Sequence, residues 1–157
     1  FQEKSRRPFL NDKAEALGVP IGPERGQLVR GQPISLVDGR VIHPDDVLGP
    51  EILGAKLVFV GDAGRTDNLV AVAQNADALI IEATYLDPDA EIAARFGHIT
   101  AAQAAHLARE AQVNQLYLTH LSRRYRELDV LNEARAIFPN TIVARDFDRI
   151  KVVKEKK

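Results

Sequence analysis

From residue 56 onward, short runs of apolar residues alternate with stretches in which apolar side chains recur every three or four positions. The runs KLVFV (56–60), ALIIEA (78–83) and QLYLTH (115–120) are typical of buried strands. The stretches between them predict helices over residues 67–76, 88–96 and 100–111, the last opened by a Thr-x-x-Gln capping box. A helix near 128–138 and strands at 141–146 and 149–153 are expected to follow. This order of elements predicts an α/β fold.

The first 55 residues have a different pattern and are rich in Pro, Gly and Arg. We expect a short helix at 12–17 that stops at Gly18, and no helix in the following GVPIGPERG. Apolar residues alternate around Asp38-Gly39, which predicts a hairpin at about 34–42 with a type I′ turn. Residues 43–55 read as a loop. We therefore divide the chain into residues 1–55, a loop-rich segment with a hairpin, and residues 56–157, an α/β unit.

Composition excludes several classes of protein and of site. The chain has 157 residues and no cysteine, so disulfide frameworks and thiolate metal sites are excluded. The formal net charge of -1 means that nucleic-acid binding would need a local basic patch. No apolar run approaches the length of a membrane span, and we expect a cytoplasmic protein with no membrane partner.

Three of the predicted strands end near a residue that can bind a metal ion or a proton. Asp62 follows the first strand, Glu82 ends the second, and His120 ends the third. The carboxyl ends of parallel strands are where α/β folds place their sites. Taken singly, each has an ordinary alternative: Asp62 as a turn residue, His120 as a structural histidine, and His98, after Gly97, as a helix-entry residue. His43 and His106 are expected to lie in a loop and on a solvent-facing helix surface.

Together, these residues offer complementary chemistry. A carboxylate can bridge two cations, and an imidazole can complete a metal's coordination through one nitrogen. A second histidine held by a glutamate can stay protonated, because the nearby negative charge favours imidazolium. Such a group can protonate a leaving oxygen. Asp62, Glu82, His98 and His120 are therefore the candidate site residues.

Four segments, in order, resemble the ribonuclease Z family, whose members remove 3′ trailers from precursor tRNA. VFVGDAGRTDNL is similar to the family's Gly-Asp-Thr segment, and ALIIEATY to its His-Glu-Ala-Thr segment. GHITAAQAA is similar to its His-Ser-Thr segment, and LTHLSRRY to its last ligand motif. The stretch from residue 13 to 50 looks like the part that joins the enzyme's two halves, and the resemblance runs from about Asp12 to Val143.

The resemblance implies a fold and residue roles. The fold would be half of a metallo-β-lactamase-type αββα sandwich, with a mixed sheet and flanking helices. Asp62 would bridge two Zn²⁺ ions, with Mn²⁺ or Fe as other possibilities, and His120 would bind one of them. His98 would contact the scissile phosphate or protonate the leaving group, with Glu82 orienting it. Arg124 is a candidate for the substrate's backbone phosphates, although an ordinary solvated arginine is the alternative.

The chain departs from the family's pattern in two ways. Ala63, Ile81 and Ile99 stand where Thr, His and Ser are usual, which puts substrate preference and rate in question. The family's His-x-His-x-Asp-His motif and its tRNA-gripping arm lie in the N-terminal half, and nothing in this sequence matches them. We therefore expect this chain to be the C-terminal half, inactive alone, with exposed apolar surface that a partner half or a homodimer covers. The alternative functions are hydrolysis of small phosphodiesters or sulfate esters, and an inactive interaction module.

Overall fold

The computed structural model describes residues 1–154, which form two compact units: Lys4–Gly54, and Phe1–Glu3 together with the chain from Ala55 onward. Each unit has its own core of buried apolar residues. None of the helices in the described part of the chain is long and apolar enough to cross a bilayer. The role of the first unit as a connecting segment between two halves stays a prediction.

The smaller unit contains helices α1 (Asn11–Ala16), α2 (Pro23–Val29) and α3 (Pro44–Val47) and the antiparallel pair β1 (Ile34–Ser35) and β2 (Val41–Ile42). The predicted short helix and hairpin are confirmed. Three expectations for this unit were wrong. Two concern helices: α2 begins inside GVPIGPERG, because Pro23 occupies its first turn, where no N–H is needed, and α3 interrupts the expected loop. The turn is not type I′, because only Gly39 has a positive φ, of 86°, and Gly39 N–H donates to Leu36 O while Leu36 N–H donates to Arg40 O. This is the three-residue hairpin loop with a left-handed glycine.

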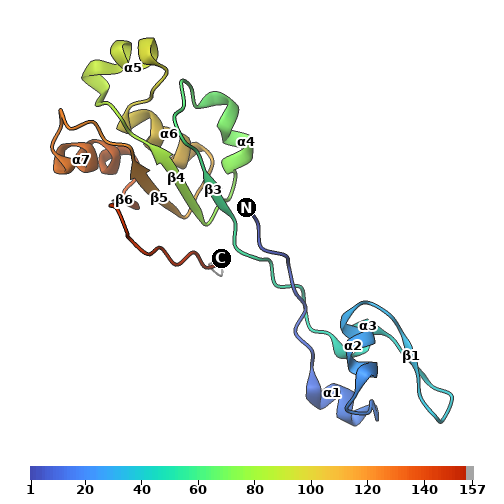
Figure 1. Ribbon diagram of the computed structural model, residues 1–157. Helices are drawn as coiled ribbons and strands as arrows, with labels where there is room; N and C mark the ends of the chain where they lie inside the picture. Colours follow the sequence, from blue (N-terminus) through green and yellow to red (C-terminus); the bar gives the residue numbers. More distant parts are fainter. Residues whose placement is uncertain (155–157) are drawn as a thin grey trace. The chain divides into compact units, whose positions relative to one another are not determined.

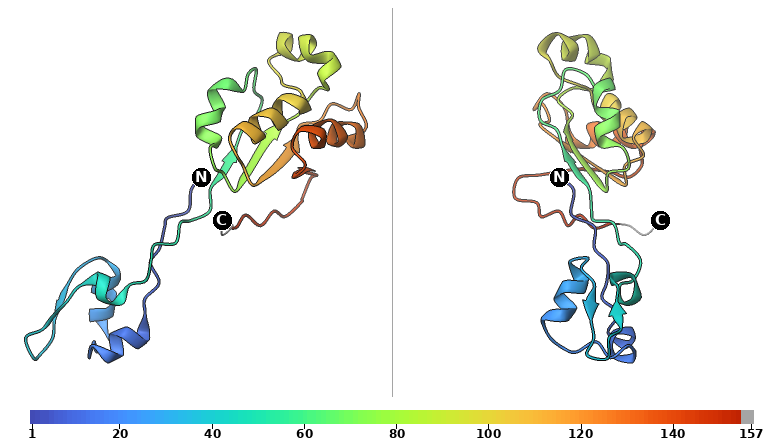
Figure 2. Two further views of the ribbon diagram at one scale, coloured as in Figure 1. Left: turned by 180° about the vertical axis from the view of Figure 1, so that it is seen from behind. Right: turned by 90° about the vertical axis from the view of Figure 1, so that its right-hand side faces the viewer.

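The larger unit has two layers, a four-stranded sheet and a layer of helices. Its sheet has the order β3 (Leu57–Phe59), β4 (Ala78–Glu82), β5 (Gln115–Thr119), β6 (Thr141–Val143). The connections carry η1 (Asp67–Leu69) with α4 (Val70–Ala73), then η2 (Asp87–Asp89), α5 (Ala90–Phe96) and α6 (Ala101–Glu110), and finally α7 (Glu127–Ile137). Figure 1 shows the strands side by side with these helices around them, and the back and side views in Figure 2 place α4, α6 and α7 on the same face of the sheet.

The predicted α/β class is confirmed, and two details of the sheet differ. All three ladders of the main sheet are parallel, whereas a mixed sheet was expected; antiparallel pairing occurs in β1–β2 and in isolated bridges. The expected strand at 149–153 is absent from the described structure. A turn, closed by Asp148 N–H on Arg145 O and by Arg145 N–H on Asp148 Oδ2, follows β6, and residues 149–153 stay outside the sheet.

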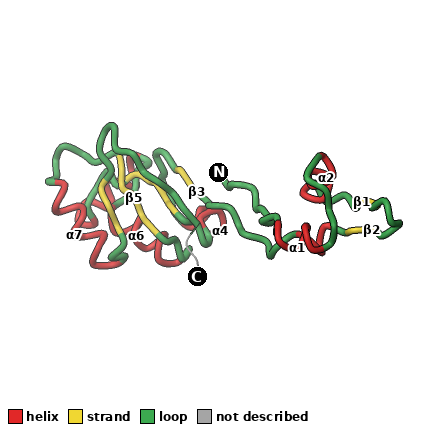
Figure 3. The backbone as a smooth tube through the Cα atoms, turned by 90° about the horizontal axis from the view of Figure 1, so that it is seen from below, coloured by secondary structure: helices red, strands yellow, loops and turns green. Residues whose placement is uncertain are grey.

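One face of the sheet packs on the helices and the other keeps exposed apolar side chains. Figure 3 shows the strands of the larger unit beside its helices, and Val58, Leu79, Leu116 and Val143 belong to the same buried core as residues of α6 and α7. The register places Phe59, Ile80, Tyr117 and Ile142 in one row across the opposite face. Phe59 is 70% exposed and Ile142 is 41% exposed. The exposed apolar surface expected from the sequence is therefore present.

Candidate metal and catalytic site

The carboxyl ends of β3, β4 and β5 bring three of the candidate residues to one edge of the sheet. These strands are parallel neighbours, so the segments that follow them leave the sheet at the same edge. Asp62 lies three residues beyond β3, Glu82 is the last residue of β4, and His120 directly follows β5. His98 reaches the same place from the turn between α5 and α6.

The Asp62 loop is fixed by backbone hydrogen bonds on both sides of the residue. Val60 N–H donates to Ile80 O at 2.8 Å, and Ala63 N–H donates to Glu82 Oε1 at 2.6 Å. Gly64 lies so close to the His98 turn that a Cβ added to it would be 3.5 Å from Gly97 Cα. The Asp62 side chain itself is 61% exposed, which leaves its carboxylate free to meet a ligand.

His98 follows the end of α5 and contacts Glu82. Gly97 takes a left-handed conformation, φ 73°, as glycine commonly does at helix ends, and His98 N–H donates to Ala93 O at 2.9 Å. Its Nδ1 lies 3.0 Å from Glu82 Oε2 and 3.1 Å from Oε1. Because a carboxylate only accepts hydrogen bonds, Nδ1 carries the hydrogen here, and Nε2 remains for the site.

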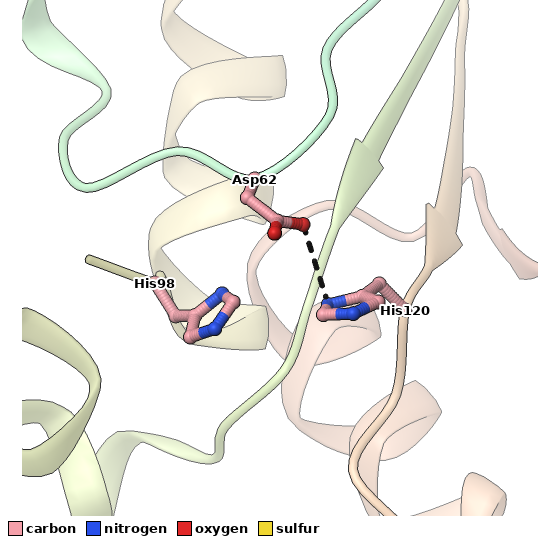
Figure 4. A group of neighbouring side chains, drawn as sticks. All are labelled: Asp62, His98 and His120. Atoms are coloured by element: carbon pink, nitrogen blue, oxygen red, sulfur yellow. Dashed lines mark ion pairs between the residues drawn. The ribbon is translucent and has the colours of Figure 1, made fainter. Parts of the chain in front are cut away.

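His120 has a left-handed backbone, φ 53°, which is uncommon for a residue other than glycine. The hydroxyl of Thr84 lies 3.0 Å from His120 O and 2.9 Å from His120 Nδ1. The Asp62 carboxylate lies 3.5 Å from the same ring nitrogen. In Figure 4 the Asp62 carboxylate lies above the gap between the His98 and His120 rings, whose centroids are 5.4 Å apart.

Asp62, His98 and His120 together could hold a metal ion. Each offers one ligand atom, and these atoms all lie within 4.8 Å of one another. One carboxylate and two imidazoles match the donor types that Zn²⁺ accepts, and three protein ligands are the usual number for a catalytic zinc. The sequence had suggested Asp62 and His120 as ligands and His98 as a catalytic residue; the structure brings all three together, and the division of roles stays a prediction.

Glu82 is fully buried at the centre of this arrangement. Its carboxylate accepts hydrogen bonds from Ala63 N–H, the Thr84 hydroxyl and His98 Nδ1–H. A buried carboxylate is tolerated only with such partners. Glu82 therefore connects the Asp62 loop, the end of β4 and the His98 turn, and its role in orienting His98 stays a prediction.

Arg124 is exposed and lies close to an aromatic neighbour of the site. Its guanidinium is 5.9 Å from the centre of the Tyr85 ring, a cation–π distance, and the Tyr85 ring is 6.0 Å from that of His98. The side chain is therefore placed near the site but not among the potential metal ligands.

The two remaining histidines lie elsewhere. His43 precedes α3 in the smaller unit, and His106 is exposed on α6, where its Nδ1 is 2.9 Å from Arg109 Nη2. The solvent-facing position predicted for His106 is confirmed.

Thr84 is the site residue that reasoning from the sequence missed. It is 8% exposed and contacts Glu82, His98 and His120 through one oxygen. Its spacing was a usable signal, because residues two apart along an extended chain point to the same side, and Thr84 is two residues beyond Glu82.

The three departures from the family pattern all occupy buried positions. Ile81 and Ile99 are 0% and 1% exposed and belong to the main core, and Ala63 is 9% exposed and joins the same cluster. At position 63 the contact with Glu82 is made by the backbone N–H, so it does not require a threonine side chain.

Known proteins with similar sequences or folds identify the superfamily. Residues 19–121 match the family described as the beta-lactamase superfamily domain, which is well over half of the chain. This chain belongs to the beta-lactamase superfamily. The metallo-beta-lactamase fold protein YhfI from Bacillus subtilis has a similar fold, with a TM-score of 0.55 and 23% identity over 73% of this chain and 46% of that one.

Within the superfamily, the predicted resemblance to ribonuclease Z is confirmed. The chain is 51% identical over 152 residues to ribonuclease Z of Bradyrhizobium diazoefficiens (strain JCM 10833 / BCRC 13528 / IAM 13628 / NBRC 14792 / USDA 110), covering 97% of this chain and 50% of that protein. It is 43% identical over 153 residues to ribonuclease Z of Methanothermobacter thermautotrophicus, covering 97% of this chain and 50% of that protein. The chain thus spans about half the length of the curated relatives it matches.

Proposed function

We propose that this superfamily member is part of a metal-dependent endoribonuclease that processes tRNA 3′ ends by hydrolysing a phosphodiester. The observation that carries the proposal is the cluster of Asp62, His98 and His120, backed by a buried glutamate bound to His98. The relatives at 43–51% identity are named ribonuclease Z, which supports RNA as the substrate class.

Asp62 and His120 are the residues we assign to metal binding. A carboxylate can bridge two cations, and Asp62 is exposed enough to do so. When bound, the metal supplies Lewis acidity and lowers the pKa of water toward neutrality. We favour Zn²⁺, because His and Asp ligands without thiolates suit it, although Mn²⁺ or Fe suits them as well.

His98 and Glu82 are the residues we assign to proton transfer. Glu82 accepts from His98 Nδ1–H, which leaves Nε2 as the nitrogen that faces substrate. With a hydrogen on both nitrogens, the ring can donate to a phosphate oxygen or protonate the leaving oxygen. Because Glu82 is fully buried, its carboxylate interacts with His98 and not with solvent.

Arg124 is the residue we assign to the backbone phosphates of the RNA. It is exposed, lies beside Tyr85 near His98, and carries a planar guanidinium that can pair with a phosphate through two N–H groups. The same proposal includes a complementary half that supplies the remaining ligands, so that the 157 residues alone are inactive. It also includes a homodimer and a cytoplasmic location.

The test is cleavage of a 3′-trailered tRNA precursor by the natural polypeptide that contains this chain, with Zn²⁺ present. We expect cleavage at the acceptor end, and a fall of about 10²–10⁴-fold in His98→Ala, the usual contribution of a general acid. His106→Ala is the matched control, because that histidine is exposed and outside the cluster. A chromogenic phosphodiester assayed in parallel identifies a small-ester hydrolase if it alone is cleaved. Failure on both substrates, without metal binding, would indicate an inactive module.

A further inference from the structure

Thr84 makes more polar contacts within the site than its small side chain suggests. Its hydroxyl oxygen is close to Glu82 Oε2, lies 3.0 Å from His120 O and 2.9 Å from His120 Nδ1, and is 3.4 Å from His98 Nδ1. The residue is 8% exposed, so water has little access to its hydroxyl.

The number of hydrogens available decides which group donates in each contact. A threonine hydroxyl has one hydrogen to donate and lone pairs that accept. The contact with Glu82 Oε2 is the shortest of the four, and two oxygens so close need a hydrogen between them. An ionised carboxylate supplies none, so the hydrogen comes from Thr84.

The ring of His120 must then be the donor in its own contact with Thr84. Because the hydroxyl hydrogen is directed at Glu82, Oγ1 presents a lone pair to His120 Nδ1 at 2.9 Å. The Asp62 carboxylate, 3.5 Å from the same nitrogen, is the more distant partner. Nδ1 therefore carries the hydrogen in the neutral ring, and Nε2 keeps its lone pair.

We propose that Thr84 is a positioning residue that selects the Nδ1–H tautomer of His120 and so leaves Nε2 as the nitrogen available to a metal ion. The step from tautomer to metal binding rests on the proposed function, whereas the tautomer itself does not. The same oxygen lies 3.0 Å from His120 O, a contact to which it donates no hydrogen while that hydrogen is directed at Glu82.

The experiment is nitrogen NMR of the histidine rings in the metal-free natural polypeptide labelled with ¹⁵N-histidine. Spectra are taken at about pH 9, well above the ~6.5 of an ordinary imidazole. The His120 signals are assigned by their loss in His120→Gln. We expect Nδ1 of His120 to carry the hydrogen in the wild type. A wild-type ring with its hydrogen on Nε2 overturns the proposal without any variant.

Two substitutions separate the hydroxyl from the shape of the side chain. Thr84→Ser keeps the hydroxyl and should keep the Nδ1–H tautomer. Thr84→Val removes it and should move His120 toward the Nε2–H form that a free imidazole prefers in water. The ring of His106, exposed on α6, should not change in either variant. An unchanged His120 tautomer in a folded Thr84→Val protein contradicts the proposal.

Cleavage of precursor tRNA gives the second readout. We expect Thr84→Val to lose about 10–100-fold, as is usual when the partner of a metal ligand is removed, and Thr84→Ser to recover most of it. If the wild type shows the Nδ1–H tautomer but cleaves no RNA, the proposed function fails and the tautomer assignment stands. If the wild type cleaves RNA but His120 carries its hydrogen on Nε2, the tautomer assignment fails and the proposed function stands.

Discussion

The clearest consequence of the site's construction concerns the removal of the Glu82 carboxylate. In Glu82→Ala, Ala63 N–H loses its 2.6 Å acceptor, and His98 Nδ1 loses its 3.0 Å partner. Thr84 can turn its hydrogen to His120 O, 3.0 Å away. One buried backbone N–H is therefore left without an acceptor, beside a space that the fully buried side chain had filled.

The loss of folding stability in Glu82→Ala follows from these lost contacts. A buried donor without a partner costs about 1–3 kcal/mol. The unfilled space adds to this, and the regained solvation of a buried charge offsets part of it. We expect about 3 kcal/mol in total, which for a protein of this size corresponds to roughly 6–12 °C in Tm. Glu82→Gln keeps the shape and one acceptor oxygen, so its cost should be about 1 kcal/mol.

Thermal unfolding of the 157-residue chain, followed by circular dichroism, tests whether Glu82→Ala lowers Tm more than Glu82→Gln, and cleavage is measured on the same variants of the natural polypeptide that contains the chain. Glu110→Ala is the control, because Glu110 is an exposed carboxylate at the end of α6, where such changes usually stay within about 0.5 kcal/mol. Cleavage by Glu82→Gln should fall about 10–100-fold although its Tm stays near that of the wild type. Equal Tm values for Glu82→Ala and Glu110→Ala, or full activity in Glu82→Gln, would refute the argument.

Four further outcomes are expected. Chelation should abolish cleavage and added Zn²⁺ should restore it, while Asp62→Asn should weaken Zn²⁺ binding at least about tenfold in calorimetry. Thr100→Ala should lower stability by about 1 kcal/mol, because Thr100 Oγ1 caps α6 by accepting from a backbone N–H at 3.1 Å; Thr100→Ser should not. Burial and the neighbouring Asp89 carboxylate raise the pKa of Tyr125 above its ordinary 10.0, so Asp89→Asn should lower the midpoint of its alkaline absorbance titration. The stability that this raised pKa contributes is present below pH 10.0 and is lost as the pH rises through the folded-state pKa. Phe59→Ser should reduce self-association of the 157-residue chain in sedimentation without lowering Tm, because Phe59 is 70% exposed; a wild-type chain that stays monomeric at high concentration would contradict this.

Local sequence predicted the central strands because burial on a parallel sheet leaves continuous apolar runs. The runs at 78–83 and 115–120 became β4 and β5, with the pairs Leu79–Leu116 and Ile81–Leu118 in register. Once the strands are parallel neighbours, Asp62, Glu82 and His120 must leave the sheet at one edge. The convergence of the candidate residues was therefore predictable from the order of elements.

What local sequence could not show depends on contacts between distant segments. Thr84 acquires its role only because His98 and His120, 14 and 36 residues away in the sequence, meet its hydroxyl. The apolar alternation at 149–153 resembles a strand, but the turn at Arg145–Asp148 leaves it without a ladder. Strand propensity indicates that a segment can form a strand, but the strand forms only where a neighbouring strand pairs with it.

The structure limits how the three departures from the ribonuclease Z pattern can affect substrate preference and rate. Ala63, Ile81 and Ile99 are buried, so none of them can distinguish substrates by touching them. Any effect on rate must pass through the packing that holds Glu82 and His98 in place. The contact at position 63 comes from the backbone, and Ile99, between His98 and the helix cap at Thr100, has no polar atom in its side chain. The chain therefore keeps the polar connections of the site in Glu82, Thr84 and the backbone, and fills the surrounding positions with apolar side chains that exclude water from them.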